Sequence, residues 1–191
     1  MKTFIYLLLF LFVTPAFATE VNLTKSTFKW TATKVTGKHF GKVFLKSGTA
    51  KLKDNELTQA EFVINMQSFT VDDLTGEWET KFLNHIKSDD FFSVNKFPDA
   101  KLVIQSSKNN VATASLTIKD KTNSVKIDYQ QKNNHFTGTL SFDRTKFGII
   151  YGSGSFRFVP SGIVQLINFS IGSLNSFQFT ILYTSLPFTK S

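Results

Sequence analysis

The side chains that most often carry out protein chemistry are few in this sequence and lie far apart. There is no cysteine, which excludes a thiol nucleophile, a disulfide and any Cys-ligated metal site. The three histidines, His39, His85 and His135, lie in separate segments, and none has a second histidine two or four residues away. The pattern therefore favours structural or surface histidines over metal ligands, and no metal site is predicted.

The remaining candidates for catalysis are equally sparse. Asp89 and Asp90 could form a carboxylate pair for acid–base work, but adjacent acidic residues on a turn more often cap helices. The segment 152–155 reads Gly-Ser-Gly-Ser, whereas a nucleophile elbow needs G-x-S-x-G between a strand and a helix. There is no glycine-rich phosphate loop either. The sequence predicts no catalytic residues, and the protein is not expected to be an enzyme.

Phenylalanine is the unusual feature of the composition, with 22 residues against 2 Trp and 4 Tyr. Its ring is large and apolar and carries no hydrogen-bonding group. So many of them indicate a large apolar interior. Two interpretations stay open at this point: a Phe-rich packed core, and a core that also holds an apolar ligand.

The charge is positive but spread out. The 22 Lys and Arg exceed the 14 Asp and Glu, for a formal net charge of +8. The lysines recur along strand-like segments, and no recognition helix or paired RNA-binding aromatics are visible. Nucleic acid is therefore not an expected partner, while anionic surfaces or ligands are compatible with the charge.

Residues 1–18 read as a secretory signal peptide. Lys2 is followed by an apolar run over residues 4–13, and residues 16–18 form the small-x-small cleavage pattern Ala-Phe-Ala. The run is too short to cross a bilayer as a helix. We expect the mature chain to begin at Thr19 and the protein to be periplasmic or secreted.

The elements that must position any site follow a period of two from residue 27 onward. Apolar and polar residues alternate over 27–33, 57–66, 100–105, 111–119, 124–130 and 135–143, with shorter runs at 43–45 and 48–53. A further strand is expected to begin at residues 147–151. Seven or eight short strands joined by hairpin loops predict an all-β antiparallel barrel, which can fill its interior with side chains or hold one small ligand.

One segment breaks this period. Trp78, Phe82 and Ile86 are spaced four apart, which predicts an amphipathic helix of about three turns over residues 76–87, with a capped turn or short second helix to residue 92. The simpler explanation of the stripe, and the favoured one, is packing of the helix on the barrel. The alternative is a helix that covers the barrel mouth and lines a cavity.

The C-terminus differs from the rest of the chain. No acidic residue follows Asp143, and residues 156–191 carry only Arg157 and Lys190 as charges. Apolar and polar residues alternate poorly in this stretch. Two interpretations of residues 156–191 stay open: a hydrophobic closing hairpin, and an altered or frameshifted end.

Several segments in order give a family resemblance over residues 28–155. The motifs that carry it are Phe28-Lys29-Trp30 with residues 35–39, Asn65-Met66-Gln67-Ser68-Phe69, the segment 85–92 (HIKSDDFF) with Lys96-Phe97-Pro98, Leu116-Thr117-Ile118-Lys119, and residues 142–149 (FDRTKFGI). With these motifs in this order, the sequence resembles the YceI-like family of periplasmic polyisoprenoid-binding proteins. The family pattern departs after Phe156, where an acidic turn and a closing strand would be expected.

The resemblance implies an extended antiparallel lipocalin-like barrel of about eight strands with a helical insertion at about 76–92. It divides the chain into a signal peptide (1–18), a lipid-binding barrel (19–155) and an atypical tail (156–191). It also implies an apolar cavity for an isoprenoid lipid or quinone, with no cofactor. The alternatives are a secreted interaction protein with a packed barrel and, less favoured, an enzyme that modifies an isoprenoid. A carrier role is compatible with transient membrane contact, and an unpaired strand edge with a homodimer.

We predict from the resemblance and the alternation that a set of apolar side chains faces the cavity. Its members are Trp30, Phe44, Phe62, Ile64, Trp78, Phe82, Ile86, Phe91, Phe92, Leu102, Ile104, Leu116, Ile118 and Phe142. The candidates for contact with an anionic head group are Lys38, His39 and Arg144, although Arg144 is more readily explained as a structural partner of Asp143 or Asp90.

Overall fold

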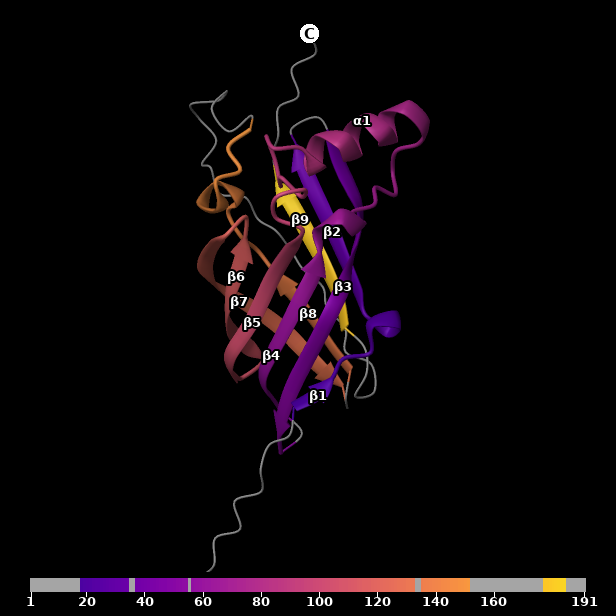
Figure 1. The fold of residues 1–191 in the computed structure, drawn as a ribbon. Helices are drawn as coiled ribbons and strands as arrows, with labels where there is room; N and C mark the ends of the chain where they lie inside the picture. The colour runs from indigo at the N-terminus through magenta and orange to yellow at the C-terminus, as the bar shows by residue number, and fades with distance from the viewer. Residues whose placement is uncertain (1–17, 35–36, 55, 133–134, 152–176, 185–191) are drawn as a thin grey trace, which may run out of the picture.

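Most of the chain forms one β-sheet that curves round on itself, with helix α1 (Gly76–Lys87) over one end (Figure 1). The computed structural model describes residues 18–34, 37–54, 56–132, 135–151 and 177–184. The predicted signal peptide, except Ala18, lies outside these residues, as does the predicted tail except strand β9. The strands are β1 (Ala18–Glu20), β2 (Thr27–Lys34), β3 (Gly37–Lys53), β4 (Glu56–Asn65), β5 (Asp99–Lys108), β6 (Val111–Ile118), β7 (Lys121–Lys132), β8 (His135–Leu140) and β9 (Phe177–Thr184).

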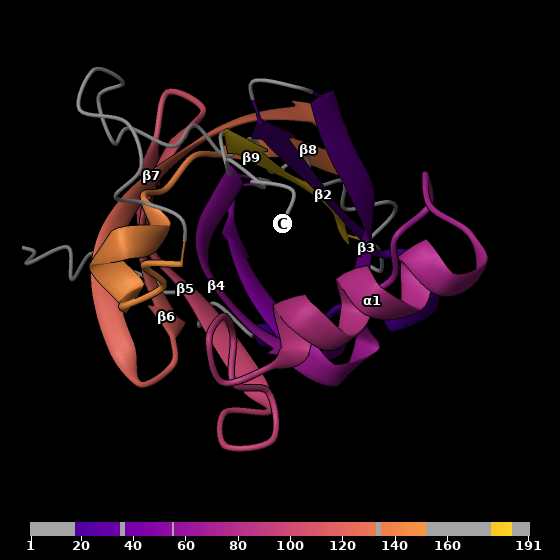
Figure 2. The same cartoon turned by 90° about the horizontal axis from the view of Figure 1, so that it is seen from above.

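The strands pair in the order β1-β3-β2-β9-β8-β7-β6-β5-β4, and an additional β3–β4 pairing joins the two ends. Strands β2 to β9 therefore form a ring, which is seen end-on in Figure 2. Neighbours from β2 to β8 pair antiparallel, which confirms the predicted antiparallel barrel. β9 differs, because it pairs parallel with both β2 and β8.

β3 is the longest described strand and is shared by several partners. Its first half pairs with β2 through Gly37–Val43, and its second half pairs with β4 from Phe44 onward. The sequence suggests two runs here, at 43–45 and 48–53, but they are one strand. A register shift between Leu45 and Ser47 lets the strand bend while its pairing with β4 continues.

Helix α1 spans Gly76–Lys87, which confirms the predicted helix. Glu77 and Glu79 lie in its first turn and Lys87 in its last, an arrangement that suits the helix dipole. The helix ends at Ser88, whose backbone N–H and hydroxyl both donate to the carbonyl of His85 at 3.1 and 2.7 Å. Residues 88–92 form turns and not a second helix.

The predicted strand at residues 147–151 is wrong. Instead the 3₁₀-helix η3 (Arg144–Phe147) follows β8, capped by Asp143, whose side chain accepts from the N–H of Thr145. Gly148 then adopts φ 74°, and its N–H bonds the carbonyl of Thr145 at 2.9 Å. This left-handed residue ends η3 and turns the chain, so that Ile149 is buried while Ile150 and Tyr151 are exposed.

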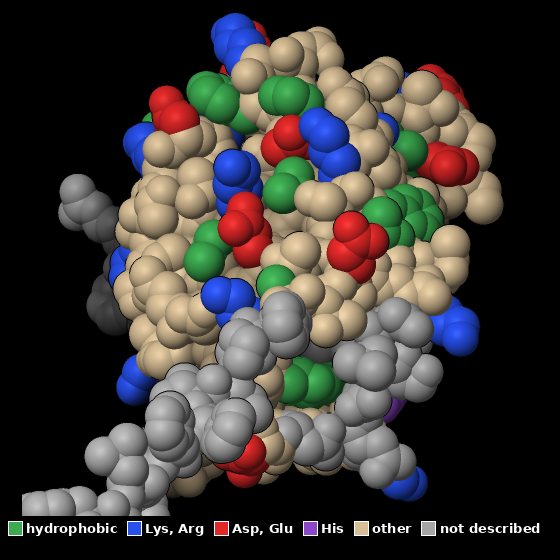
Figure 3. All heavy atoms as spheres, turned by 60° about the horizontal axis from the view of Figure 1, so that its bottom comes forward, with side chains coloured by type: hydrophobic (Ala, Val, Ile, Leu, Met, Phe, Trp, Pro, Cys, Tyr) green, Lys and Arg blue, Asp and Glu red, His purple; other side chains and the backbone are tan. Residues whose placement is uncertain are grey.

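The core lies inside the ring, because alternate residues of strands β4 to β8 point inward. Along β4, for example, Ala60, Phe62 and Ile64 are buried while Gln59 and Glu61 are exposed. On the outer surface, Figure 3 shows charged side chains of both signs interspersed with hydrophobic ones. No described helix is long and apolar enough to cross a membrane.

Candidate functional site

The predicted cavity residues from β4, β5 and β6 all lie on the inner face of the sheet. Phe62 and Leu102 have no exposed surface, and Ile104 is 1% exposed. Residues 62 and 102 are direct cross-strand partners, as are 102 and 116. Of the predicted set, the buried residues are Trp30, Phe62, Ile64, Ile86, Phe91, Phe92, Leu102, Ile104, Leu116, Ile118 and Phe142. Their burial is confirmed, whereas contact with a ligand stays a prediction.

Phe44 is a correction to that set. Its side chain is 47% exposed, so the prediction that it faces inward is wrong. Its neighbours Val43 and Leu45 are the buried ones, at 0% and 9% exposure. All three residues are apolar, so the run 43–45 alone does not show which face is inner. Lys42 and Lys46, two residues either side of Phe44, share its face and are the signal that places it outward.

Trp78 is a second correction. It is 70% exposed, so it lines no interior, and the amine of Lys81 lies 5.4 Å from the centre of its ring. Burial increases along the helical stripe, from exposed Trp78 through partly buried Phe82 to Ile86 at 5% exposure. Four-residue spacing exceeds the helical repeat of 3.6, so successive residues drift around the helix. Only the later turns of α1 therefore pack on the barrel.

Beneath α1, aromatic rings form a continuous layer at this end of the barrel. Phe82 stacks on Trp30 of β2, with ring centres 5.7 Å apart and an interplanar angle of 9°. Trp30 contacts Phe69 at 6.0 Å, and Phe69 stacks on Phe92 at 5.1 Å. Phe92 in turn meets Phe91 edge-on at 4.8 Å. The helix is thus attached to the barrel by apolar and aromatic contacts.

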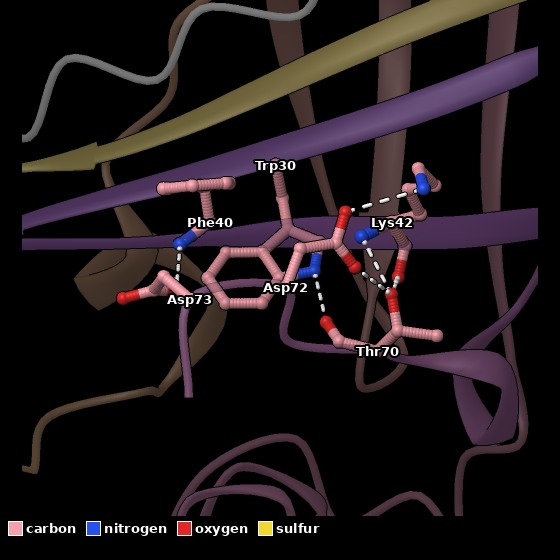
Figure 4. Close-up of polar contacts among 6 residues, drawn as sticks. All are labelled: Trp30, Phe40, Lys42, Thr70, Asp72 and Asp73. Carbon is pink, nitrogen blue, oxygen red and sulfur yellow. Dashed lines mark hydrogen bonds and ion pairs between the residues drawn. The ribbon is translucent and has the colours of Figure 1, made fainter. Parts of the chain in front are cut away.

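The segment from Met66 to Thr75, which connects β4 to α1, is bonded along the edge of β3 that β4 leaves open. Its Thr70 N–H donates to the carbonyl of Lys42 at 2.9 Å, and its Asp72 N–H donates to the carbonyl of Phe40 at 2.8 Å. The indole N–H of Trp30 donates to the carbonyl of Thr70 at 2.9 Å (Figure 4). These bonds fix the start of α1 relative to β2 and β3.

Gly41 makes this close approach feasible. A Cβ atom there would lie 2.1 Å from the carbonyl oxygen of Thr70 and 2.9 Å from the Trp30 ring. Both distances are far below van der Waals contact. No sequence motif predicts a role for Thr70 or Gly41; the signal for this contact is a glycine within an otherwise regular strand.

The three head-group candidates have different surroundings. Lys38 is exposed on β3. His39 Nδ1 lies 2.8 Å from the Asp73 carboxylate, and its ring contacts Phe82 at 5.1 Å. Arg144 is only 2% exposed, and its guanidinium donates to the carbonyls of Ile149 and Tyr151 at 2.6 and 2.8 Å. These two bonds support a structural role for Arg144. Their acceptors are backbone carbonyls, whereas the sequence predicts a carboxylate partner, Asp143 or Asp90.

His85, Asp89 and Asp90 do not form a catalytic cluster facing the interior. Both carboxylates are on exposed residues, while the His85 ring packs against Tyr151 at 4.4 Å. Burial lowers the pKa of His85, and the nearby Asp90 charge opposes that shift. Hydrogen bonds from Lys96 and Ser93 lower the pKa of Asp89, so this residue secures the turn after α1. Within the described ranges, no group of His and acidic residues could hold a metal ion.

The interior becomes polar at the end away from α1. The Tyr129 hydroxyl lies 2.6 Å from the Ser107 hydroxyl, although Tyr129 is 6% exposed. Both residues line an open pocket of about 740 Å³ between the hairpin ends, together with Asp54, Glu56 and Lys108. The described interior is therefore apolar along most of its length and has a polar group at this end.

Comparisons with known proteins agree on family and fold. The family model described as YceI-like domain matches residues 18–171. A crystal structure of Burkholderia cenocepacia BcnA is similar with a TM-score of 0.54 and 22% identity, covering 72% of this chain and 89% of that one.

Two further solved structures resemble the chain more distantly. A Campylobacter jejuni YceI protein has a TM-score of 0.49 and 19% identity, covering 69% of this chain and 84% of that one. A polyisoprenoid binding domain from Saccharophagus degradans has a TM-score of 0.45 and 8% identity, covering 71% and 82%. No curated protein sequence matches the chain.

Proposed function

The chain belongs to the YceI-like family, and we propose that it is a periplasmic or secreted binding protein that holds an isoprenoid or similar long-chain lipid for storage or transport. The observation that carries this proposal is the apolar interior under α1. Inward side chains from β4, β5 and β6 meet the aromatic layer formed by Trp30, Phe69 and Phe92. A long apolar chain needs such a surface, since each buried CH₂ contributes about 0.8 kcal/mol.

A binding role also accounts for the small number of nucleophilic and metal-binding side chains in the sequence. A lipid chain is held by contact and requires neither a nucleophile nor a metal. His39 on β3, whose ring contacts Phe82 of α1, is the proposed contact for an anionic head group, whereas Lys38 is exposed on the outer face of the same strand. The isoprenoid character of the ligand rests on the family resemblance. A quinone with an isoprenoid tail belongs to the same chemical class.

A packed barrel with a role in protein interaction is the second candidate. It is favoured by the very low exposure of the inner residues, since Phe28, Phe62 and Leu102 are fully enclosed by protein. A close-packed interior leaves no room for a ligand beside these residues unless they move.

Mass spectrometry of the mature protein, purified from the cells that make it, separates the two candidates. A mass excess in native spectra that disappears on denaturation and extracts as an isoprenoid would support the lipid carrier. A folded protein without bound lipid, even after incubation with a polyprenyl phosphate or a quinone, would contradict it and favour the packed barrel. Circular dichroism and thermal unfolding of the same sample establish that it is folded.

A further inference from the structure

The outer face of β3 carries an alternation of lysine and phenylalanine. Lys38, Phe40, Lys42, Phe44 and Lys46 are five successive outward positions before the register shift. Phe40 is 39% exposed and Phe44 is 47% exposed. Two large apolar rings on one strand are therefore in partial contact with water, separated by a lysine that Figure 4 shows bound to Asp72.

The charge of this face is positive. Lys29 on β2 is the direct cross-strand partner of Lys42, and like charges in that position destabilise a sheet. Three carboxylates lie nearby. Asp72 is 3.2 Å from the Lys42 amine, Asp99 is 2.8 Å from the Lys46 amine, and Asp73 accepts from the Phe40 N–H at 2.9 Å. No described carboxylate forms an ion pair with Lys29 or Lys38. Four lysines against three acids leave a modest positive charge, which lies at Lys29 and Lys38.

We propose that this face, formed by Lys29, Lys38, Phe40, Lys42, Phe44 and Lys46, docks on the surface of an anionic lipid bilayer. The Phe rings enter the interfacial region, and the lysines extend their apolar stems beside them while their amines reach the head groups. Anionic head groups also offset the repulsion between Lys29 and Lys42.

The alternation favours a bilayer over a protein as the occupant. Lysine is depleted in protein interfaces because its charge must be desolvated there. At a bilayer surface each lysine keeps its amine among phosphates and water, so lysine between aromatic residues is no disadvantage. The docking face consists of outward side chains of β2 and β3, so docking is independent of what the interior holds.

Co-sedimentation of the mature protein with vesicles tests the proposal. Vesicles of phosphatidylcholine mixed with phosphatidylglycerol are expected to bind the protein, whereas vesicles of phosphatidylcholine alone bind it much less. The double variant Phe40→Ser/Phe44→Ser should lower the partition coefficient about tenfold, because both apolar insertions are lost. Phe44→Ser alone should lower it by less, and Val111→Ser, which removes a 38% exposed side chain from another strand, should leave it unchanged.

A second pair of variants tests the charge. Lys29→Gln/Lys38→Gln should weaken binding and reduce its dependence on salt, since fewer charges face the membrane. Lys101→Gln/Lys126→Gln removes the same charge from exposed positions on β5 and β7 and should have a smaller effect.

Three results would overturn the proposal: no sedimentation with either vesicle, equal binding to both, or equal loss in each variant and its control. In those cases the face is open to a protein partner or to solvent. Lipid cargo is measured by mass spectrometry without vesicles, so failure of membrane docking leaves the carrier proposal untouched, and the reverse also holds.

Discussion

At the scale of single residues, Gly41 shows how one absent side chain positions the covering helix. Gly41→Ala would place a Cβ atom against the Thr70 carbonyl, so the connection to α1 or the strand must shift. We expect a loss of about 1–3 kcal/mol in the free energy of unfolding, typical of overpacking. Urea denaturation measures it. Thr49→Ala, on the outer face of the same strand, is the control and should change stability by less than about 0.5 kcal/mol; equal effects would mean that the close approach is not needed.

His85 gives the fold a predicted pH dependence. Because burial lowers its pKa in the folded state, the unfolded chain binds more protons than the folded one below the ordinary pKa of about 6.5. Its contribution to stability is therefore complete above that pH and is lost as the pH falls toward the lower, folded-state pKa. Urea unfolding at a series of pH values should show this loss. His85→Gln should flatten the curve in that window, and an unchanged slope would contradict the assignment.

The residue scale is also where sequence reasoning had its clearest limit. The inward positions of Phe62, Leu102 and Ile104 follow from alternation along their strands, because each has one polar direct neighbour that marks the outer face. Phe44 was misplaced because both of its neighbours are apolar. Arg144 was understood as structural, but sequence could not show that backbone carbonyls would be its acceptors.

At the scale of elements, α1 is predicted to control retention of the bound lipid. Phe82→Asp places a carboxylate against Trp30, which loosens the helix while the strand pairing of the barrel stays intact. We expect lipid co-purifying with the mature protein to fall several-fold with little change in circular dichroism.

Trp78→Asp is the matched control for that experiment. It makes the same substitution one turn earlier on α1, where the side chain is 70% exposed. It should leave lipid content unchanged. If both variants retain lipid equally, α1 does not cover the ligand; if both lose it equally, the loss does not come from the contact with Trp30.

Element type was predicted best where a periodic pattern was long. The helix at 76–87 and most strands follow from their period. The apolar run at residues 147–151, after β8, predicts a strand, but the structure has the end of η3 and a turn there. The Asp143 side chain accepts from the backbone N–H of Thr145, and Gly148 has a positive φ. These two backbone features make the segment a 3₁₀-helix and a turn.

At the scale of the whole molecule, ring closure depends on a strand that the sequence did not identify. Alternation and spacing predicted a barrel of about eight strands. The poor alternation after residue 156 left its last strand undefined. In the structure, β9 lies between β2 and β8 and pairs parallel with both, although β9 is remote from β2 in sequence. Pairings over such separation leave no local pattern, so only the folded chain shows them.

A truncation tests whether β9 closes the ring. Removing residues 177–191 deletes β9 and leaves the facing edges of β2 and β8 without their partner. Unpaired edges are templates for pairing with another chain. We therefore expect the truncated protein to elute as dimers or larger species in size-exclusion chromatography with light scattering, and to lose stability in urea. A control chain that ends at Thr184 keeps all of β9 and should match the full-length protein. If the shorter chain matched it as well in size and stability, then β2 and β8 do not need β9, and the barrel is an open sheet in solution.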